Sequence, residues 1–493
     1  MTVGWSESQG QGHRTIHGHA PNRHAVLPTP VRLEADGRFA GRGVTIAFLD
    51  SGFFPHPDLT SPDDRIVAFH DAEEPGRTLE PSDEPRPSEW HGTQTAVVAT
   101  GNGSLSDGLF RGLASEARVV LVKVGRRGKI GDDDIATGLE WVLANSERYR
   151  IRIVNVSLGG DRDAPLAASR VNMLAEKAIA RGLVLVVAAG NSGCSDGHGP
   201  LPPATAPSAI TVGGYEEREG AGSGDLALYC SSFGFSADGL AKPEVIALAR
   251  GVAAPILPET PAFRRAEALS RVAAAPDRFL PRLLAELARE GNGLPRFDGL
   301  SREAIRYWAE EILREEKIVA THYQHVDGTS FAAPIVSSVV AQMLEANPAL
   351  TPAAVKRILV STAERVPGAP ALRQGWGVLV ARRAVDAAER ERHGSEAAPF
   401  ERSRSEAGRL LFVYHDDTAT SVAVAGEFNG WDTAATPMRR CADGAWRAEV
   451  PAPGPGRCRY KLVVDGSRWL EDPGHGAKEP DPYGGFDSVI TIP

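Results

Sequence analysis

Continuous apolar runs alternate with stretches of helical periodicity between residues 44 and about 250. The runs are rich in Val and Ile and comprise VTIAFL (44–49), RVVLVKV (118–124), IRIVNVSL (151–158) and LVLVVAA (183–189). Between two of them, DDDIATGLEWVLANS places Ile135, Leu139, Val142 and Leu143 on one helical face. A strand that is covered on both faces has no polar side to alternate with. The pattern therefore predicts an α/β fold with a parallel sheet flanked by helices.

The alternation of predicted strands and helices is interrupted between about residues 255 and 320. FRRAEALSRVAAAPDRFLPRLLAELAREG and SREAIRYWAEEILREEK predict charged amphipathic helices with no strand between them, and TSFAAPIVSSVVAQML then restores the earlier pattern. We interpret this interval as a helical insertion in a domain that covers residues 41–390. We expect residues 1–40 to form an N-terminal extension and the polar, aperiodic residues 391–408 to form a linker.

The pattern changes again over residues 409–493. Here RLLFVYHD, SVAVAGEF, AWRAEV, RCRYKLVVDG and DSVITI are short strand-like runs separated by Gly, Pro and Asp. Such spacing is typical of an all-β sandwich. We therefore predict a small C-terminal all-β sandwich behind the α/β domain.

Composition narrows the function classes. The net charge of −9 over 493 residues is spread widely, which argues against nucleic-acid and anionic-membrane partners. The longest apolar runs are too short to span a bilayer, and the polar start has no apolar leader, so we expect a cytoplasmic protein. The four cysteines, at positions 194, 230, 441 and 458, form no C-x-x-C pair, and we expect reduced thiols.

Candidate chemistry lies at the ends of the predicted elements. Asp50 follows the strand VTIAFL, His91 begins the helical stretch HGTQTAVVATG, Asn191 follows VVAAG, and Ser330 begins the helical stretch SFAAP. Each is ordinary alone, since a serine at such a position can simply start a helix. Together they supply a nucleophile, a base, an orienting acid and an amide donor, which acyl-transfer chemistry requires.

At this point the sequence resembles the subtilisin-like serine proteases. LDSGFFPHPDL, HGTQTAVVATG, NVSLGG, VVAAGNSG, KPEV and GTSFAAP are similar to that family's motifs, and the order Asp…His…Ser is the family's own. The resemblance covers about residues 40–250 and 320–390. It implies an endopeptidase in which Asp50 orients His91, His91 deprotonates Ser330, and Asn191 donates to the oxyanion.

The same resemblance implies residues that hold the substrate backbone. They are Gly125 on one rim, Ser157, Leu158, Gly159 and Gly160 on the other, and Ala189 and Gly190 beside the oxyanion donor. Pairing of this kind adds the substrate as a strand. Arg126 and Arg127 would favour acidic substrate side chains, unless they are simply solvated loop residues.

Some family features are altered or incomplete. Gln94 stands where many members have a second His. Asp58, in HPDL, matches a calcium ligand, and GNGSLSDGL (101–109) lies where a second part of that site would come. Calcium takes six to eight oxygen ligands, so we expect no required cofactor and leave calcium open. The helical insertion would cover the cleft, bind a partner or decorate the surface.

The C-terminal segment resembles the glycogen-binding modules of AMP-activated kinase β subunits and of branching and debranching enzymes. VAVAGEFNGWDTAATPM, RYKLVVDGSRWLEDP and DPYGGFDSVITIP carry the likeness. It implies that Trp431 and Trp469 lie against the sugar rings of an α-glucan such as glycogen while Lys461 bonds hydroxyls. Asp487 or Ser488 replaces the family's asparagine, Trp446 is expected in the core, and a protein-docking role is the alternative.

The sequence thus predicts an intracellular serine endopeptidase that acts on protein or peptide substrates and carries an α-glucan- or partner-binding module. The rival hypothesis is a catalytically silent binding scaffold that acts through the β module.

Overall fold

The computed structural model describes most of the chain. The described residues are 27–80, 84–125, 130–195, 199–217, 226–290, 294–295, 297, 299–393, 403–406, 408–416, 419–441, 444–475, 477–483 and 485–492. The start of the predicted N-terminal extension, most of the predicted linker, and Arg126 and Arg127 lie outside these ranges.

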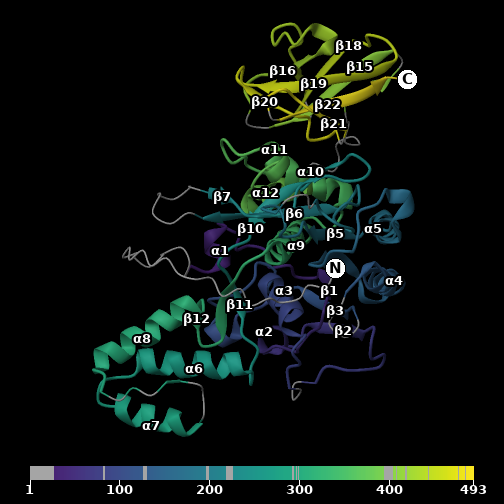
Figure 1. Ribbon diagram of the computed structural model, residues 1–493. Coiled ribbons are helices and arrows are strands. Elements are labelled where there is room, and N and C mark those ends of the chain that lie inside the picture. The colour runs from purple at the N-terminus through teal and green to yellow at the C-terminus, as the bar shows by residue number, and fades with distance from the viewer. Residues whose placement is uncertain are drawn as a thin grey trace.

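A parallel sheet forms the centre of the larger domain (Figure 1). Its strands follow the order β10-β6-β5-β4-β1-β3-β2, with β7 paired antiparallel to β6. Their bounds are β1 Thr45–Asp50, β2 Ile66–Asp71, β3 Arg118–Lys123, β4 Ile151–Val156, β5 Val184–Ala188, β6 Ile210–Glu217, β7 Leu226–Leu228 and β10 Val245–Leu248. The side chains of β1 and β5 are buried along their whole lengths, as continuous apolar runs require. The predicted α/β fold is confirmed.

Helices cover both faces of this sheet. On one face, α3 (Trp90–Thr100), α9 (Thr329–Ala346), α10 (Pro352–Thr362) and α12 (Ala381–His393) pack around Phe48, Leu121 and Val186. On the other, α4 (Asp132–Tyr149) and α5 (Arg170–Ala180) pack against Leu49, Val122 and Val187. Short elements α1 (Thr29–Arg32), α2 (Pro57–Thr60), η1 (Ser104–Ser106), η2 (Leu166–Ala168), β8 (Gly234–Phe235), β9 (Ala241–Lys242) and α11 (Ala371–Gln374) complete the domain.

Helices α6 (Pro261–Ala274), α7 (Leu280–Glu290) and α8 (Arg302–Glu315) occupy the interval read as an insertion. They pack around an apolar cluster of their own that includes Leu269, Leu280 and Ile305, and they project from the domain as an arm (Figure 1). The arm grows from a small antiparallel sheet of β11 (Val252–Pro255), β13 (Tyr323–Val326) and β12 (Ile318–Ala320). Strand β12 lies within the interval in which we expected helices alone.

The C-terminal module consists of two antiparallel sheets, with strand orders β14-β15-β18-β17 and β16-β19-β22-β21, and β20 pairs with β19. The bounds are β14 Arg404–Glu406, β15 Arg409–His415, β16 Val422–Gly426, η3 Glu427–Asn429, β17 Arg439–Arg440, β18 Ala445–Pro451, β19 Gly456–Val464, β20 Arg468–Leu470, β21 Lys478–Pro480 and β22 Phe486–Ile492. Phe412, Tyr460 and Trp446 lie in its core, so the predicted burial of Trp446 is confirmed.

The expectation of reduced thiols is wrong for one pair of cysteines. Cys194 and Cys230 form a disulfide, whereas Cys441 and Cys458 are free. The topology brings the loop after β5 beside the segment after β7. The spacing of the cysteines along the sequence does not predict this contact. Among the described residues, we find no helix that combines the length and the apolar character needed to cross a membrane.

Candidate active site

The order of the central strands gathers the candidate residues at one edge of the sheet. Neighbouring strands β3, β1, β4 and β5 are parallel, so their carboxyl ends point to the same edge. Asp50 ends β1, Ser157 follows β4, and Asn191 lies just beyond β5. Ligands of open α/β sheets bind at such an edge.

Asp50 and His91 form the best-defined pair of the site. Asp50 is completely buried, and its Oδ1 accepts hydrogen bonds from His91 Nδ1 at 2.7 Å and from the Ser51 N–H at 2.7 Å. Helix α3 approaches Asp50 closely at Gly92, where an added Cβ would lie 2.8 Å from Asp50 Cβ and 2.3 Å from the Gly52 carbonyl. Glycine at position 92 is therefore what lets His91 reach the carboxylate.

The electrostatics of the pair favour a basic imidazole. Burial alone would lower the pKa of His91, but the charge of Asp50 and its hydrogen bond raise that pKa above its ordinary value. The Nδ1–H is committed to Asp50, which leaves Nε2 as the atom that can accept a proton. The side chain of His91 is 21% exposed, so a substrate can reach that atom.

Ser330 is the second residue of α9 and does not cap this helix; the N-cap is Gly328. Its carbonyl accepts a hydrogen bond from Ser157 Oγ at 2.9 Å, because Pro334 has no N–H to offer it. Its own Oγ lies 3.5 Å from the Ser157 carbonyl oxygen. The neighbouring Phe331 ring lies 5.8 Å from the His91 ring, which places the start of α9 beside the base.

Asn191 meets the same helix start from the other side. Its Oδ1 accepts hydrogen bonds from the Thr329 N–H at 2.9 Å and from Thr329 Oγ1 at 3.1 Å. With the oxygen engaged, the Nδ2 amide is the part of the side chain that can donate to a substrate. Asn191 and Ser330, far apart in the sequence, are thus brought to one helix N-terminus.

The residues expected to hold the substrate backbone lie along the same edge. Gly125 follows β3, Ser157 to Gly160 follow β4, and Ala189 and Gly190 follow β5. Ser157 and Gly160 are buried, Leu158 is half-buried and Gly159 is exposed. A cavity of about 270 Å³ opens beside Gly125 and is also lined by Ser51, Ser88, Lys123, Glu73 and Glu74.

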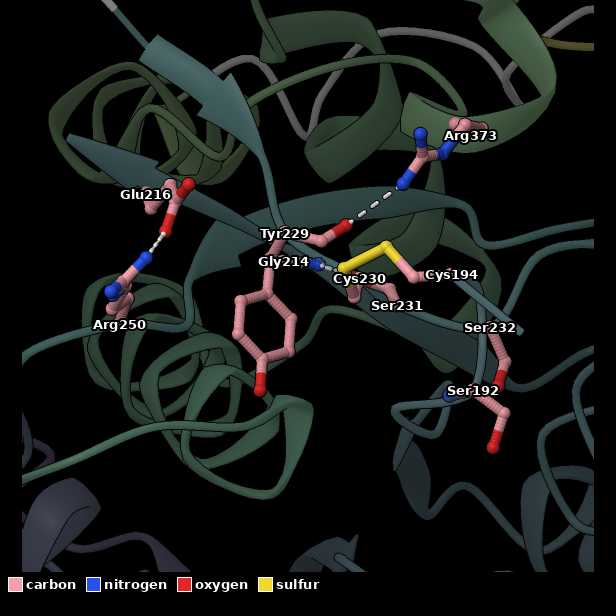
Figure 2. Close-up of a disulfide and its surroundings, with 10 residues drawn as sticks. All are labelled: Ser192, Cys194, Gly214, Glu216, Tyr229, Cys230, Ser231, Ser232, Arg250 and Arg373. Atoms are coloured by element: carbon pink, nitrogen blue, oxygen red, sulfur yellow. Dashed lines mark hydrogen bonds and ion pairs between the residues drawn. A yellow bond between two sulfur atoms is a disulfide. The ribbon is translucent and has the colours of Figure 1, made fainter. Parts of the chain in front are cut away.

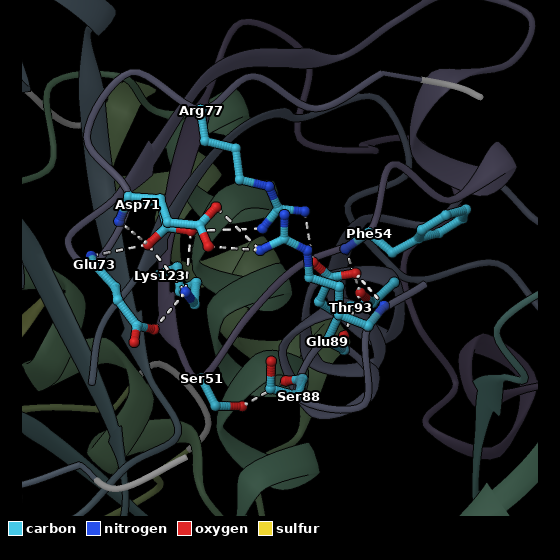
Figure 3. Close-up of polar contacts among 11 residues, drawn as sticks. Ser51, Phe54, Asp71, Glu73, Arg77, Ser88, Glu89, Thr93 and Lys123 are labelled. Carbon is cyan, nitrogen blue, oxygen red and sulfur yellow. Dashed lines mark hydrogen bonds and ion pairs between the residues drawn. The ribbon is translucent and has the colours of Figure 1, made fainter. Parts of the chain in front are cut away.

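A polar network beneath the site was missed by the sequence analysis (Figure 3). Lys123 Nζ donates to both oxygens of Asp71 at 3.0 Å and to Glu73 at 3.1 Å. Arg77 joins Asp71 to Glu89, which is buried and directly precedes α3. These contacts fix the ends of β2 and β3 to the helix that carries His91. The charges of RIVAFHD and LVKV were the available signal.

Both oxygens of the expected calcium ligand, Asp58, already accept hydrogen bonds from protein groups. Asp58 Oδ1 accepts from Ser104 Oγ at 3.0 Å and from the Leu105 N–H at 3.3 Å, and Oδ2 accepts from the Tyr323 hydroxyl at 2.8 Å. Burial and the nearby Asp58 charge raise the pKa of Tyr323, so this hydroxyl stays a donor. The residues present therefore do not fit a calcium site.

On the C-terminal module, Trp431 and Trp469 form an aromatic pair with ring centroids 6.5 Å apart. Trp469 is 44% exposed. Lys461 lies in β19, two positions before Val463, the register partner of Trp469; it is ion-paired with Asp481, and its side chain is 13% exposed. Asp487 and Ser488, candidates for the position of the missing asparagine, are both buried.

Comparison with known proteins yields matches to both parts of the chain. Residues 41–377 match the model of the Subtilase family, and residues 399–484 match Carbohydrate-binding module 48 (Isoamylase N-terminal domain). Both predicted resemblances are thereby confirmed. Serine protease AprX of Bacillus subtilis is 29% identical over 331 residues, which cover 65% of this chain and 61% of AprX. Subtilisin BL of Lederbergia lenta is 34% identical over 157 residues, covering 31% of this chain and 50% of that protein.

A crystal structure of fervidolysin from Fervidobacterium pennivorans, described as a keratinolytic enzyme related to subtilisin, aligns with a TM-score of 0.49 at 19% identity. That alignment covers 95% of this chain and 57% of fervidolysin. The chain thus spans roughly half to three fifths of the length of these relatives.

Proposed function

Because the chain belongs to the subtilase family, we propose that it is a serine endopeptidase that hydrolyses peptide bonds with Asp50, His91 and Ser330. The observation that carries this proposal is the 2.7 Å bond between Asp50 and His91 at the sheet edge where α9 begins with Ser330. An acid, a base and a hydroxyl at one edge are the parts that acyl transfer needs.

In the proposed reaction, His91 Nε2 removes the proton of Ser330 Oγ as that oxygen attacks the scissile carbonyl carbon. The bond from Asp50 keeps the proton of neutral His91 on Nδ1 and stabilises the imidazolium that forms. His91 then protonates the leaving amine, and water enters to release the acyl group from Ser330 by the same steps in reverse.

Asn191 Nδ2 and the Ser330 backbone N–H are the proposed donors to the oxyanion. Thr329 supports this role by engaging the amide oxygen of Asn191. The Ser330 N–H lies in the first turn of α9, where it has no carbonyl partner within the helix and where partial positive charge accumulates. Donors of this kind act on charge that develops only in the transition state.

We assign the substrate backbone to the gap between Gly125 and residues 157–160, where an extended peptide would pair as an added strand. The cavity beside Gly125 would take a substrate side chain. Its rim carries Glu73 and Glu74 as well as Lys123, and Lys123 is neutralised by Asp71 and Glu73.

A fluorophosphonate probe tests the enzymatic proposal. It should label the wild-type chain and fail to label Ser330→Ala, and Ser330→Ala and His91→Ala should each abolish peptide hydrolysis. Ser338→Ala is the matched control, because Ser338 lies on the same helix, buried and bonded to the Ile335 carbonyl. A wild-type chain that is folded but neither labelled nor active would support the silent-scaffold alternative.

The C-terminal module is proposed to bind an α-glucan. The paired rings of Trp431 and Trp469 support this assignment, since an exposed aromatic face is a suitable surface for the C–H face of a sugar ring. Lys461 contributes less, because Asp481 already holds its ammonium group.

Native electrophoresis in glycogen tests this assignment with the full chain in a Ser330→Ala background. Glycogen should retard the protein, Trp431→Ala or Trp469→Ala should remove the retardation, and Lys461→Ala should weaken it less. The control is Trp446→Phe, which changes a core ring. If the folded protein migrates identically with and without glycogen, the module is better assigned to a protein partner.

The disulfide argues against the cytoplasmic location expected from the sequence, because such bonds persist mainly in oxidising compartments. We therefore propose that the enzyme works in its oxidised form. Alkylation of thiols during rapid lysis tests this point, since an oxidised chain retains two cysteines out of reach of the reagent.

A further inference from the structure

Cys194 lies on the loop that carries Asn191, three positions further along the chain. This oxyanion loop, residues 190–195, follows β5 and is joined to residues 229–232 (Figure 2). Besides the disulfide, the Gly193 N–H donates to the Cys230 carbonyl at 3.1 Å. The Ser192 N–H donates to Ser232 Oγ at 3.2 Å, and the Ser232 N–H donates to the Gly190 carbonyl at 2.9 Å.

Residues 229–232, the segment that supports that loop, are themselves held by hydrogen bonds. The Gly214 N–H of β6 donates to Ser231 Oγ at 2.6 Å, and the Tyr229 N–H donates to the Gly214 carbonyl at 3.0 Å. Arg373 donates to the Tyr229 carbonyl at 3.2 Å (Figure 2). Residues 229–232 are thus hydrogen-bonded to the central sheet, and the disulfide in turn restrains the oxyanion loop.

The loop itself approaches residues 229–232 without intervening side chains. Gly190 has a φ of +99°, and an added Cβ there would lie 2.8 Å from Ser232 Oγ. An added Cβ at Gly193 would lie 1.8 Å from the Ser231 carbonyl. Hydrogen bonds hold the loop at Gly190 and Ser192, and the disulfide holds it at Cys194. Asn191 therefore lies in a segment whose backbone is restrained on both sides.

We propose that the Cys194–Cys230 disulfide is a positioning element for the oxyanion donor, so that the redox state of this pair sets the rate of the chemical step. The inference rests on the proposed function. An oxyanion donor must lie within hydrogen-bond distance of an oxygen that carries charge only in the transition state. Releasing the loop would move Asn191 Nδ2 relative to that oxygen while leaving the strand-like substrate contacts at residues 157–160 in place.

The pair is accessible to the reductant that such control requires. Cys194 is exposed and Cys230 is half-buried. A thiolate of a soluble dithiol attacks one sulfur of the protein disulfide, forming a mixed disulfide as the protein S–S bond breaks. That step frees the first protein thiol; the second thiol of the reagent then attacks the reagent sulfur of the mixed disulfide, which frees the second protein thiol and leaves the dithiol as a cyclic disulfide.

The test begins with the full-length wild-type chain and dithiothreitol. Under denaturing conditions the untreated protein should show two reactive thiols, those of Cys441 and Cys458, and the reduced protein should show four. Reduction should lower kcat on a chromogenic peptide at least about tenfold with KM changed less than about twofold, and reoxidation should restore it. A peptide aldehyde, whose adduct places an oxyanion in this site, should bind weaker by a similar factor.

Variants separate positioning from simple stabilisation. Cys194→Ser and Cys230→Ser should reproduce the loss without dithiothreitol and show no further response to it, while Cys441→Ser should behave as wild type. In an Asn191→Ala background, which by itself should lower kcat by about 10²–10³, reduction should have no further effect on kcat, because the donor it positions is gone.

An equal fold-loss on reduction in wild type and Asn191→Ala would show a general structural role and overturn the inference. So would an unchanged kcat in the reduced, folded enzyme, or four reactive thiols before reduction. These outcomes differ from failure of the proposed function, which would appear as absence of probe labelling and of hydrolysis in the oxidised wild-type chain.

Discussion

Asp50 determines the pH range in which His91 can act as a base. In the proposed mechanism the active form of His91 is neutral, and the carboxylate raises the pKa of this imidazole. Activity should therefore rise with pH through a value above the ordinary histidine pKa of about 6.5. Because the same bond fixes the tautomer, the orientation of the ring and its titration are properties of one contact.

Asp50→Asn is accordingly expected to lower kcat by about 10⁴, because an amide can hold the wrong tautomer of the ring. The acid limb of the kcat/KM profile should move to lower pH, since the removed charge no longer favours the imidazolium. Peptide hydrolysis measured across the pH range checks both effects. Asp64→Asn, at an exposed loop position, is the control. An unshifted acid limb would contradict the assignment of that limb to His91.

The pKa of His56 is shifted in the direction opposite to that of His91, and this shift links stability to pH. It is completely buried, and its Nδ1 accepts from the Asp58 N–H at the start of α2. Burial lowers the pKa of His56 to about 4. Between that value and the unfolded value of about 6.5, the unfolded chain binds more protons than the folded chain, so stability is lost as pH falls through this window.

We expect the free energy of unfolding to fall by about 2–3 kcal/mol from pH 7 to pH 4 on account of His56. In His56→Asn, whose side chain can also accept at a helix start, that part of the pH dependence should vanish even if overall stability is lower. Urea unfolding in the Ser330→Ala background at several pH values measures the slope. Equal slopes in the two proteins would assign the acid sensitivity to other groups.

At the scale of elements, the arm of α6, α7 and α8 has a core separate from that of the catalytic domain. Large side chains such as Phe279 and Tyr307 remain exposed on it, at 50% and 64%. Its strands β12 and β13 lead along the chain to Ser330. These features suit an element that contacts large substrates without forming part of the reaction centre.

Replacing residues 258–316 with a short Gly/Ser loop should leave a folded domain that hydrolyses small peptides at close to the wild-type rate. Cleavage of folded proteins should change several-fold, because their approach to the cleft is altered. Parallel assays on a chromogenic peptide and on casein make the comparison. Unchanged kinetics on both substrates would show that the arm is dispensable for substrate access.

The sequence predicted central strands with nearly continuous burial but missed β10, which is buried along its whole length. The central strands β1, β3, β4 and β5 were found because both faces are covered, which makes most of their positions apolar, although Arg152 and Asn155 interrupt β4. Strand β2 at the sheet edge is mostly half-buried, and β6 carries adjacent glycines, so neither produces such a run. The motifs likewise placed Asp50, His91 and Asn191 at element boundaries, and the structure has each of them at or beside such a boundary, while their catalytic roles stay a prediction.

Contacts between distant segments were beyond the reach of sequence patterns. The Tyr323–Asp58 bond joins residues 265 positions apart, and the disulfide joins residues 36 apart. Both contacts depend on how the order of the β-strands places distant loops side by side. The residue types at these positions do not reveal the contacts in the sequence. The buried network of Lys123, Asp71 and Arg77 has the same origin.

At the scale of the whole molecule, the module lies against the end of the catalytic domain near α10 and α11 (Figure 1). Lys478 Nζ lies 3.6 Å from the centroid of the Trp376 ring, and Arg365 is paired with Glu471. Phe235 and Phe486 meet with ring centroids 6.1 Å apart. Both residues are half-buried, and burial lowers the pKa of Lys478 to about 7, so the cationic form that favours the Trp376 ring predominates only below that pH.

Trp376→Ala should therefore loosen the module from the catalytic domain. Small-angle scattering should give a larger radius of gyration, and calorimetry should separate the unfolding of the two parts. Trp431→Ala, which changes a ring of the proposed glucan surface, is the control and should leave both measurements unchanged. A Trp376→Ala protein as compact as wild type would place the docking energy in the other contacts.

The hydrogen bonds from Tyr323 and Ser104 to Asp58 affect how the stability of the protein depends on the ions in solution. An ion that binds the folded state adds RT ln(1 + [L]/Kd) to stability, so the fraction of folded molecules then follows the free ion concentration. Where protein donors already satisfy the carboxylate, that thermodynamic linkage is absent at this position. The contacts of Asp58 should therefore hold the start of α2 equally in calcium-poor and calcium-rich fluids, and a chelator should not loosen them.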